Sequence, residues 1–301
     1  MKVTVTGATG LIGSRVVARL KARGDEVTVL SRDPQRARAR LDVAALQWQP
    51  SGEPAPVAAL SGRDAVLNLV GENVAQRWTD KAKRAIRSSR VDATLNLVSG
   101  IRAADPRPRA LVSSSAVGIY GAHGDERVDE TTPPAVDFLA GVCREWEEAA
   151  QSAGELGVRV ACVRTGVVLD AAGGALKTML PPFKAGLGGP VAGGEQYMPW
   201  IHVDDVVGIM LAALDGEAWE GAVNATAPEP VTNREFSKAL GRVLHRPAVA
   251  PVPALALRLL YGEMAEIVTT GQRAVPARPV ELGYEFAHVQ LEAALASALA
   301  V

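Results

Sequence analysis

Apolar and polar positions alternate along the first two-thirds of the chain with two different periods. Five short runs rich in β-branched residues have the pattern of buried strands, at residues 2–5, 26–30, 65–70, 109–114 and 158–163. Apolar residues recur with helical spacing at 11–23, near 80–102 and at 137–156. Strands that alternate with helices of this length predict right-handed crossovers and a parallel sheet covered on both faces. The predicted fold class is therefore α/β, with a doubly wound parallel sheet.

This alternation loosens after about residue 170. Glycine-rich stretches at 173–174 and 186–190 predict loops that bend sharply. Thr232, with Glu235 three residues later, is a capping-box arrangement and predicts the start of a helix. A further helical run covers 255–261, and the segment 283–286 leads to a terminal helix. We interpret this C-terminal third as a smaller lobe over the sheet, with a substrate cleft between the two.

The stretch from Thr6 to Gly13 carries the most specific chemical signal. It follows the first strand and opens into the first helix, which is the context in which spaced glycines predict dinucleotide binding. Gly7 permits the tight turn, Gly10 lets backbone amides approach a pyrophosphate, and Gly13 lets helix and strand pack closely. The helix N-terminus adds free N–H groups and a partial positive charge. We expect the cofactor to contact Gly7, Thr9, Gly10, Leu11, Ile12 and Gly13.

The end of the second strand predicts which dinucleotide binds. An acidic residue there would accept hydrogen bonds from the ribose 2′-hydroxyl of NAD, whereas an arginine accommodates the 2′-phosphate of NADP. Here the strand ends in Ser31 and Arg32, and a hydroxyl beside a guanidinium suits a phosphate dianion. Arg38 and Arg40 follow, and we assign them to a solvated helix face. The sequence predicts NADP, with its 2′-phosphate at Ser31 and Arg32.

Composition limits the classes of partner. Of the 301 residues 48% are hydrophobic and 22% charged, and the net charge of −1 creates no global field for nucleic acid or an acidic membrane. The basic run at 77–90 lacks an aromatic platform and predicts a solvated helix face, with part of its charge open to the cofactor or an anionic substrate. Cys143 and Cys162 lack metal-ligand spacing, so we expect no metal site. Two thiols and the lack of a membrane-length apolar run predict a cytoplasmic protein. We expect a small-molecule substrate and neither a nucleic-acid nor a membrane partner, and the sequence is compatible with a homodimer.

Several further segments resemble one known superfamily. They include the serine segment Val112-Ser113-Ser114-Ser115-Ala116 with Tyr120-Gly121, the strand end Asn68-Leu69-Val70-Gly71, and the downstream motif Trp200-Ile201-His202-Val203-Asp204-Asp205. Together with the glycine motif, they resemble the extended short-chain dehydrogenase/reductase superfamily of nucleotide-sugar epimerases and dehydratases. Other segments resemble its epimerase family protein branch, among them Trp146-Glu147, Arg164-Thr165-Gly166, Tyr261-Gly262-Glu263-Met264 and Gly271-Gln272-Arg273. The resemblance covers essentially the whole chain.

The resemblance implies a Rossmann-type sheet with a small C-terminal substrate lobe. We predict an NADP-binding Rossmann domain at 1–170, to which 200–225 returns. Substrate-lobe segments are predicted at 171–250 and a short C-terminal domain at 251–301. Carried over residue by residue, the resemblance implies further cofactor contacts at Asn68, Leu69, Val70, Gly71, Ser89, Ser113, Arg164, Gly166 and Val167.

The active site of that superfamily combines a serine with a tyrosine and a lysine that lie one helical turn apart. Ser115 matches the serine, which orients a substrate hydroxyl or carbonyl. On the next helix, where the tyrosine and the lysine are expected, this chain has Phe138 and Val142. Phenylalanine has no acidic proton and valine has no charge, so the usual general acid is missing.

Three explanations follow from this departure. First, the proton donor is relocated: Tyr120 is the leading candidate, although it is equally well interpreted as a pocket-wall aromatic residue. His123, His202 and Glu147 are weaker candidates, because we expect His202 to be structural and Glu147 to be a helix-surface carboxylate. Second, the chemistry needs little acid help; third, the protein binds NADP without turning it over. We expect an NADP-dependent oxidoreductase or epimerase-type enzyme with Ser115 and Tyr120 as catalytic residues, and the alternative is a non-catalytic NADP-binding sensor or scaffold.

Overall fold

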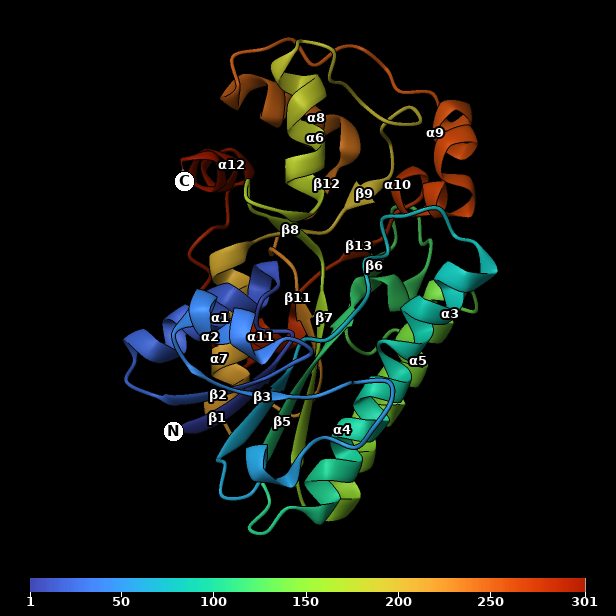
Figure 1. Ribbon diagram of the computed structural model, residues 1–301. Coiled ribbons are helices and arrows are strands. Elements are labelled where there is room, and N and C mark those ends of the chain that lie inside the picture. Colours follow the sequence, from blue (N-terminus) through green and yellow to red (C-terminus); the bar gives the residue numbers. More distant parts are fainter. Residues whose placement is uncertain (301) are drawn as a thin grey trace.

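The computed structural model describes residues 1–300; Val301, the last residue of the predicted C-terminal domain, lies outside the described residues. Seven parallel strands form one sheet in the order β11-β7-β5-β4-β1-β2-β3, which fans out through the lower half of Figure 1. The strands are β1 (Lys2–Thr6), β2 (Glu26–Ser31), β3 (Ala44–Gln47), β4 (Ala65–Asn68), β5 (Ala110–Ala116), β7 (Arg159–Thr165) and β11 (Gly221–Ala225). The strand order reverses between β1 and β4, where a doubly wound sheet opens a crevice for ligands. The predicted fold class is confirmed.

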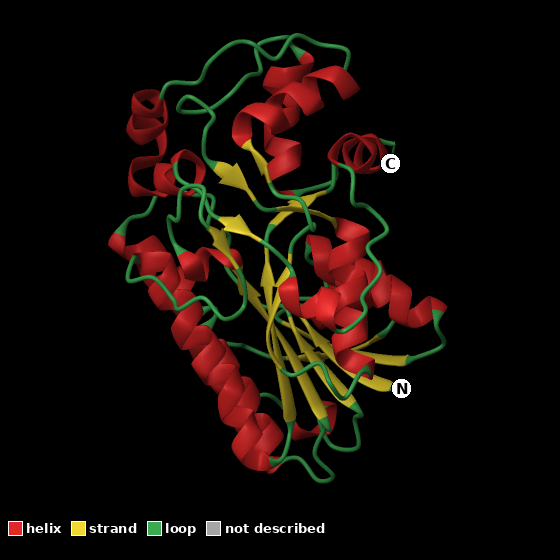
Figure 2. Cartoon of the chain, turned by 180° about the vertical axis from the view of Figure 1, so that it is seen from behind, coloured by secondary structure: helices red, strands yellow, loops and turns green. Residues whose placement is uncertain are grey.

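Helices cover both faces of this sheet, as Figures 1 and 2 show from opposite sides. One face carries α1 (Leu11–Ala22), α2 (Pro34–Leu41) and α7 (Val203–Asp215). The other face carries α4 (Val91–Ala103) and α5 (Phe138–Gln151). Because each face is covered, central strands are buried on both sides, and β1 is buried at every position after its first residue.

The structure differs from the predicted elements in three places. The sequence pattern does not predict β3, because residues 44–47 contain no β-branched side chain. The helical stretch near 80–102 is divided into α3 (Asp80–Ser88) and α4, because α3 ends at Ser88 and Ser89 is its C-cap. The stretch at 137–156 is α5 followed by a 3-10 turn at Ser152–Leu156. Hydrophobic spacing alone does not show such breaks, because each later piece continues the run of buried apolar residues.

A smaller lobe lies above the carboxyl ends of the strands in Figure 1. Three of its helices, α6 (Gly174–Lys184), α8 (Asn233–Val243) and α12 (Leu291–Leu299), pack around a shared apolar core. Thr232 and Glu235 form the predicted capping box at the start of α8. Two short pairs, β8 (Val167–Leu169) with β10 (Trp200–His202) and β9 (Tyr197–Met198) with β12 (Val231–Thr232), connect the lobe to the sheet.

The last part of the chain returns along the outside of the molecule. It begins with α9 (Ala254–Tyr261) and α10 (Glu266–Thr269), which lie at the edge of the lobe. β13 (Arg273–Ala274) then pairs with β6 (Arg127–Val128), and α11 (Ala277–Glu281) packs beside β11. This segment therefore contacts both the lobe and the edge of the sheet.

Candidate active site

A cleft of about 680 Å³ opens at the carboxyl ends of β1, β2 and β4, where the strand order reverses. Its lining includes the predicted cofactor contacts Gly7, Thr9, Gly10, Ser31, Arg32, Leu69, Val70, Gly71 and Ser89. Sequence reasoning missed the rest of the lining, which is Ala8, Val29, Leu30, Gln49, Pro50, Ser51, Gly52 and Glu72. Residues 49–52 follow β3, a strand that the sequence pattern does not predict, so no signal pointed to them.

The glycine turn is shaped by close approaches of backbone to backbone. Gly7 has a φ of 64°, and a Cβ there would lie 2.3 Å from the carbonyl oxygen of Leu69. A Cβ at Gly13 would lie 2.4 Å from the carbonyl oxygen of Gly7. Gly10 is the N-cap of α1 and makes no side-chain capping bond. The first amides of α1 are therefore left for an anion, which is the arrangement that dinucleotide phosphates require.

The end of β2 presents a hydroxyl and a guanidinium to the same cleft. Ser31 Oγ accepts a hydrogen bond from the backbone N–H of Asp33 and donates to its carbonyl, both at 3.1 Å. Arg32 is exposed on the cleft wall. Asp33 is turned away to cap α2, where its carboxylate accepts from the backbone N–H of Arg36 at 3.0 Å. Because the carboxylate of Asp33 is engaged at α2, a phosphate at this position would meet the cation of Arg32 with no carboxylate between them.

Ser115 belongs to a buried polar network near the carboxyl end of β5. Its hydroxyl donates to Glu147 Oε1 at 2.6 Å, and Arg164 donates to the two oxygens of the same carboxylate at 2.8 and 2.9 Å. The side chains of Arg164 and Glu147 are only 8% and 13% exposed. The expectation that Glu147 is a helix-surface carboxylate is wrong, because it lies on the face of α5 that packs against β7. Its partner Arg164 belongs to β7, so nothing in the sequence near Glu147 indicates this ion pair.

Tyr120 continues this network on the other side of Arg164. Its side chain is fully buried, and its hydroxyl donates to Asn224 Oδ1 at 2.7 Å and accepts from Arg164 Nη1 at 2.9 Å. Burial raises the pKa of Tyr120 to about 12. This arrangement favours a structural role over a catalytic one, because a satisfied hydroxyl with a raised pKa is a poor proton donor. Tyr120 is not part of the cleft lining, so its place on a pocket wall stays a prediction. The catalytic role of Tyr120 stays a prediction.

The two positions that lack the usual tyrosine and lysine are occupied by apolar packing. Phe138 is half-buried and meets Trp78 edge-to-face at 5.2 Å between ring centroids. The ammonium of Lys83 lies 5.2 Å from the centroid of the same ring. Val142 is buried within α5. Neither position supplies an acidic proton or a cation, so any proton donor must be a different residue.

Arg90 is a cleft-side residue that sequence reasoning missed. Its guanidinium lies 5.2 Å from the centroid of the Trp146 ring, and one nitrogen donates to the carbonyl of Ile86 at 3.1 Å. It also lies so close to Gly71 that a Cβ built there would be 3.1 Å from its central carbon. Burial lowers the pKa of Arg90. Arg90 belongs to the basic run at 77–90. Helical spacing in the sequence does not show that this cation turns inward while others of the run are solvated.

Other predicted contacts lie beneath the cleft rather than on its wall. Asn68 donates to Thr94 Oγ1 at 2.9 Å and to Ser113 Oγ at 3.2 Å, and it accepts from Thr6 at 2.9 Å. A Cβ at Gly166 would lie 2.1 Å from the carbonyl oxygen of Pro199. These predictions, with those for Leu11, Ile12, Arg164 and Val167, stay predictions.

The histidine candidates have structural partners. His123 Nδ1 lies 3.2 Å from Glu126 on the surface. His202 is buried, accepts from the backbone N–H of Asp204 at the start of α7, and stacks on His288 at 3.7 Å between ring centroids. Burial lowers the pKa of His202. His202, Asp204 and His288 lie within reach of a single ion, but Nδ1 of His202 is already engaged in capping α7.

Comparison with known proteins extends these observations to the whole chain. The model of the NAD dependent epimerase/dehydratase family matches residues 3–225, and that of a domain of unknown function, DUF1731, matches residues 252–298. The chain is 42% identical over 306 residues to the "Epimerase family protein SDR39U1 homolog, chloroplastic" of Arabidopsis thaliana. The aligned region covers 98% of this chain and 86% of the plant protein. It is 37% identical to the human epimerase family protein SDR39U1 over 98% of both chains.

The solved structures agree with this similarity. The crystal structure of human SDR39U1 with NADPH superposes with a TM-score of 0.89 at 35% identity, over 99% of this chain and 98% of that chain. A UDP-galactose 4-epimerase superposes with a TM-score of 0.75 at 20% identity, which shows a shared fold. Within the described part of the chain, no helix has the length and apolar character needed to cross a membrane.

Proposed function

The chain belongs to the NAD dependent epimerase/dehydratase family as an epimerase family protein, and from this membership we propose that it is an NADPH-binding enzyme of the oxidoreductase or epimerase type. Its substrate in this proposal is a small organic molecule. The observation that carries the proposal is the cleft, which combines the glycine turn at α1 with Ser31 and Arg32 at the end of β2. The binding of NADPH by the similar human protein supports the same cofactor here.

The residues of the cleft fit each part of this cofactor. The amides of residues 11–13 suit the phosphates, and Arg32 suits the 2′-phosphate. Arg90, whose partners are a carbonyl and an aromatic ring rather than a carboxylate, lies next to Gly71 of the cleft lining. We assign it a polar contact with the cofactor, in place of the missing lysine. When bound, NADPH supplies a hydride.

The proton in this proposal moves through Ser115 rather than through a phenol. Ser115 Oγ orients the reacting oxygen of the substrate and exchanges a proton with it, and Glu147 Oε1, at 2.6 Å, takes or returns that proton. Arg164 holds both oxygens of the carboxylate, and Tyr120 positions Arg164. Tyr120→Phe should then leave turnover largely intact, whereas a catalytic role for Tyr120, as the sequence predicts, requires the loss of turnover.

A non-catalytic NADP-binding sensor or scaffold remains the alternative function. Phe138 and Val142 favour it, because α5 offers neither an acidic proton nor a cation at these positions. Both functions require NADPH binding, so a binding measurement tests only the cofactor. A turnover measurement distinguishes the enzyme from the sensor or scaffold.

Thermal unfolding tests the cofactor. At free NADPH near 100 times Kd, binding to the folded state should stabilise the protein by ~2.7 kcal/mol. NADH at the same concentration should shift the melting temperature less, because it lacks the 2′-phosphate. If neither nucleotide raises the melting temperature, both proposed functions are wrong.

Turnover is tested by following NADPH absorbance when purified protein is added to a small-molecule cell extract. Ser115→Ala should abolish protein-dependent consumption of NADPH and leave its binding unchanged. Ser114→Ala is the matched control, because successive side chains of β5 point to opposite faces of the sheet. Consumption that survives in Ser115→Ala would rule out the proposed role of this serine. Proven binding without consumption by the wild-type protein would favour the sensor.

We also propose that the protein works in a reducing compartment such as the cytoplasm. Cys143 and Cys162 are both free and buried, which suits thiols that are never oxidised. Burial raises the pKa of Cys143 to about 12, so its thiolate is scarce at neutral pH.

A further inference from the structure

One edge of the molecule exposes more apolar surface than scattered side chains account for. Helix α9 has no buried residue at all, and its side chains of Leu255, Leu259 and Leu260 are 69%, 71% and 66% exposed. Tyr261 at the end of α9 and two residues of α10, Ile267 and Val268, are exposed beside them. We call these six side chains the apolar edge. Contiguous exposure of this kind marks an interaction surface rather than ordinary surface composition.

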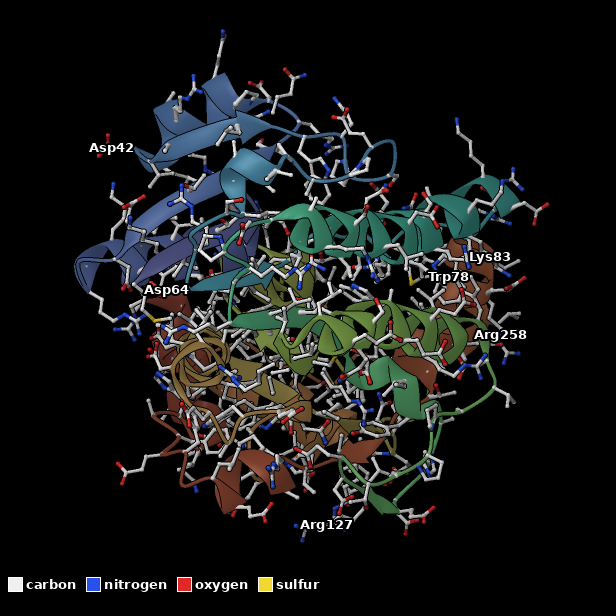
Figure 3. All side chains as sticks on the ribbon, turned by 90° about the horizontal axis from the view of Figure 1, so that it is seen from below. Asp42, Asp64, Trp78, Lys83, Arg127 and Arg258 are labelled. Atoms are coloured by element: carbon white, nitrogen blue, oxygen red, sulfur yellow. The ribbon has the colours of Figure 1, made fainter. Side chains whose placement is uncertain are left out.

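The basic run at 77–90 lies against this apolar edge, although the two are far apart in sequence. Arg77 donates to the carbonyl oxygen of Leu259 at 3.2 Å, and Lys83 forms an ion pair with Glu263 just beyond α9. Figure 1 shows α3, α9 and α10 along the same side of the molecule, and in Figure 3 Lys83 and Trp78 lie on the same side as Arg258. The basic run and the apolar edge therefore lie side by side on this part of the surface.

The charge of this surface is locally positive. Arg77, Lys81, Arg84 and Arg258 are exposed there. The nearby carboxylates are Asp80 and Glu266, together with Glu263, which Lys83 neutralises. The net charge of −1 for the whole chain averages over this asymmetry. The expectation of no membrane partner rested on that average and on the lack of a spanning segment, and neither describes a local surface.

We propose that the apolar edge and its basic flank dock the protein onto the surface of an anionic lipid bilayer. Leucine side chains would enter the boundary between headgroups and acyl chains, while lysine and arginine side chains meet anionic headgroups. A second copy of this chain fits less well. In a two-fold symmetric contact the same patch meets itself, so the contact supplies no patch of opposite charge to the basic flank. The bilayer supplies the opposite charge along with the apolar phase.

Vesicle co-sedimentation tests this docking. The full-length protein is mixed with phosphatidylcholine vesicles or with vesicles that also contain phosphatidylglycerol, at low and at high salt. We expect binding to the anionic vesicles at low salt, weak binding to phosphatidylcholine alone, and loss of binding at high salt. Lack of binding to anionic vesicles at low salt, or equal binding to both kinds, overturns the proposal.

Two pairs of variants locate the surface. Leu255→Glu/Leu260→Glu should abolish binding, and Leu95→Glu, at a 50% exposed leucine on α4, is the matched control that should retain it. Lys81→Glu/Arg84→Glu should weaken binding by about five-fold for each basic side chain removed, before any added repulsion. Arg36→Glu/Arg40→Glu on α2 is its control.

Every result decides the question. Equal losses in test and control variants would show binding that does not use this surface. Light scattering on the protein alone identifies the competing occupant: a dimer that Leu255→Glu/Leu260→Glu converts to a monomer, without vesicle binding by the wild type, would assign the apolar edge to a second copy. Because these measurements need neither cofactor nor turnover, they are independent of the proposed enzymatic function.

Discussion

Arg164→Met is the most informative test of the buried network beneath the proposed catalytic serine. Methionine keeps much of the length of the side chain and removes its charge and all of its donors. The change leaves the carboxylate of Glu147, whose side chain is 13% exposed, without the guanidinium that bonds both of its oxygens. It also removes a hydrogen bond to the hydroxyl of Tyr120. The only remaining side-chain donor to Glu147 among the described residues is then Ser115.

The expected loss of unfolding free energy follows from the charge of Glu147, which stays buried without its partner. Removing one partner of a buried ion pair typically costs about 3–5 kcal/mol, because the other charge stays buried without compensation. For a chain of this size that corresponds to a fall in melting temperature of roughly 5–10 °C. The double variant Glu147→Gln/Arg164→Met removes both charges, so it should recover a large part of the loss.

Urea unfolding followed by circular dichroism measures both variants against the wild type. Arg144→Met is the matched control, because its ion pair with Glu148 is 3.9 Å long and its side chain is 50% exposed. We expect this control to change stability by less than about 0.5 kcal/mol. A cost below about 1 kcal/mol for Arg164→Met, or a double variant no more stable than Arg164→Met, would refute the reasoning.

Three further predictions concern other parts of the molecule. Arg32→Ala should weaken NADPH binding and leave NADH binding nearly unchanged; thermal shifts with both nucleotides check this, and a retained preference for NADPH would remove the 2′-phosphate assignment. Gly13→Ala should lose NADPH binding and about 1–3 kcal/mol of stability, because its Cβ would lie 2.4 Å from the carbonyl of Gly7; an unchanged urea midpoint would contradict it. The hydrogen bond from the backbone N–H of Thr232 lowers the pKa of Glu235, so its contribution is present at neutral pH and is lost as pH falls below about 4. The difference in unfolding free energy between wild type and Glu235→Gln should therefore shrink from pH 7 to pH 3, and a difference independent of pH would argue against the capping role.

The glycine turn was predictable because its constraints are local. Gly7 needs a positive φ, and Gly13 needs room for the backbone of the preceding turn, so both requirements fall within a few residues of each other. The helix start at Thr232 is local for the same reason, since the capping box connects residues three apart. Strand and helix periods add the fold class, because a parallel sheet with crossovers is the packing that such an alternation allows.

The candidate site was predictable only in part, because its contacts join distant elements. Ser115, Glu147 and Arg164 come from β5, α5 and β7, and nothing near Glu147 in sequence shows that it turns toward an arginine. Its amphipathic helix predicts a surface carboxylate, and a tertiary ion pair overrides that pattern.

The alternation of strand and helix periods in the sequence was sufficient to predict the doubly wound fold. The residues of the glycine turn and of the end of β2 were sufficient to predict the cofactor, because each motif lies within one short segment. The resemblance to the extended short-chain dehydrogenase/reductase superfamily revealed that Phe138 and Val142 stand where an acid and a cation were expected. Tertiary packing decided which charges are buried, which are paired and which lie exposed beside the apolar edge. Burial and pairing arise when elements from distant parts of the chain meet, and no local pattern encodes that meeting.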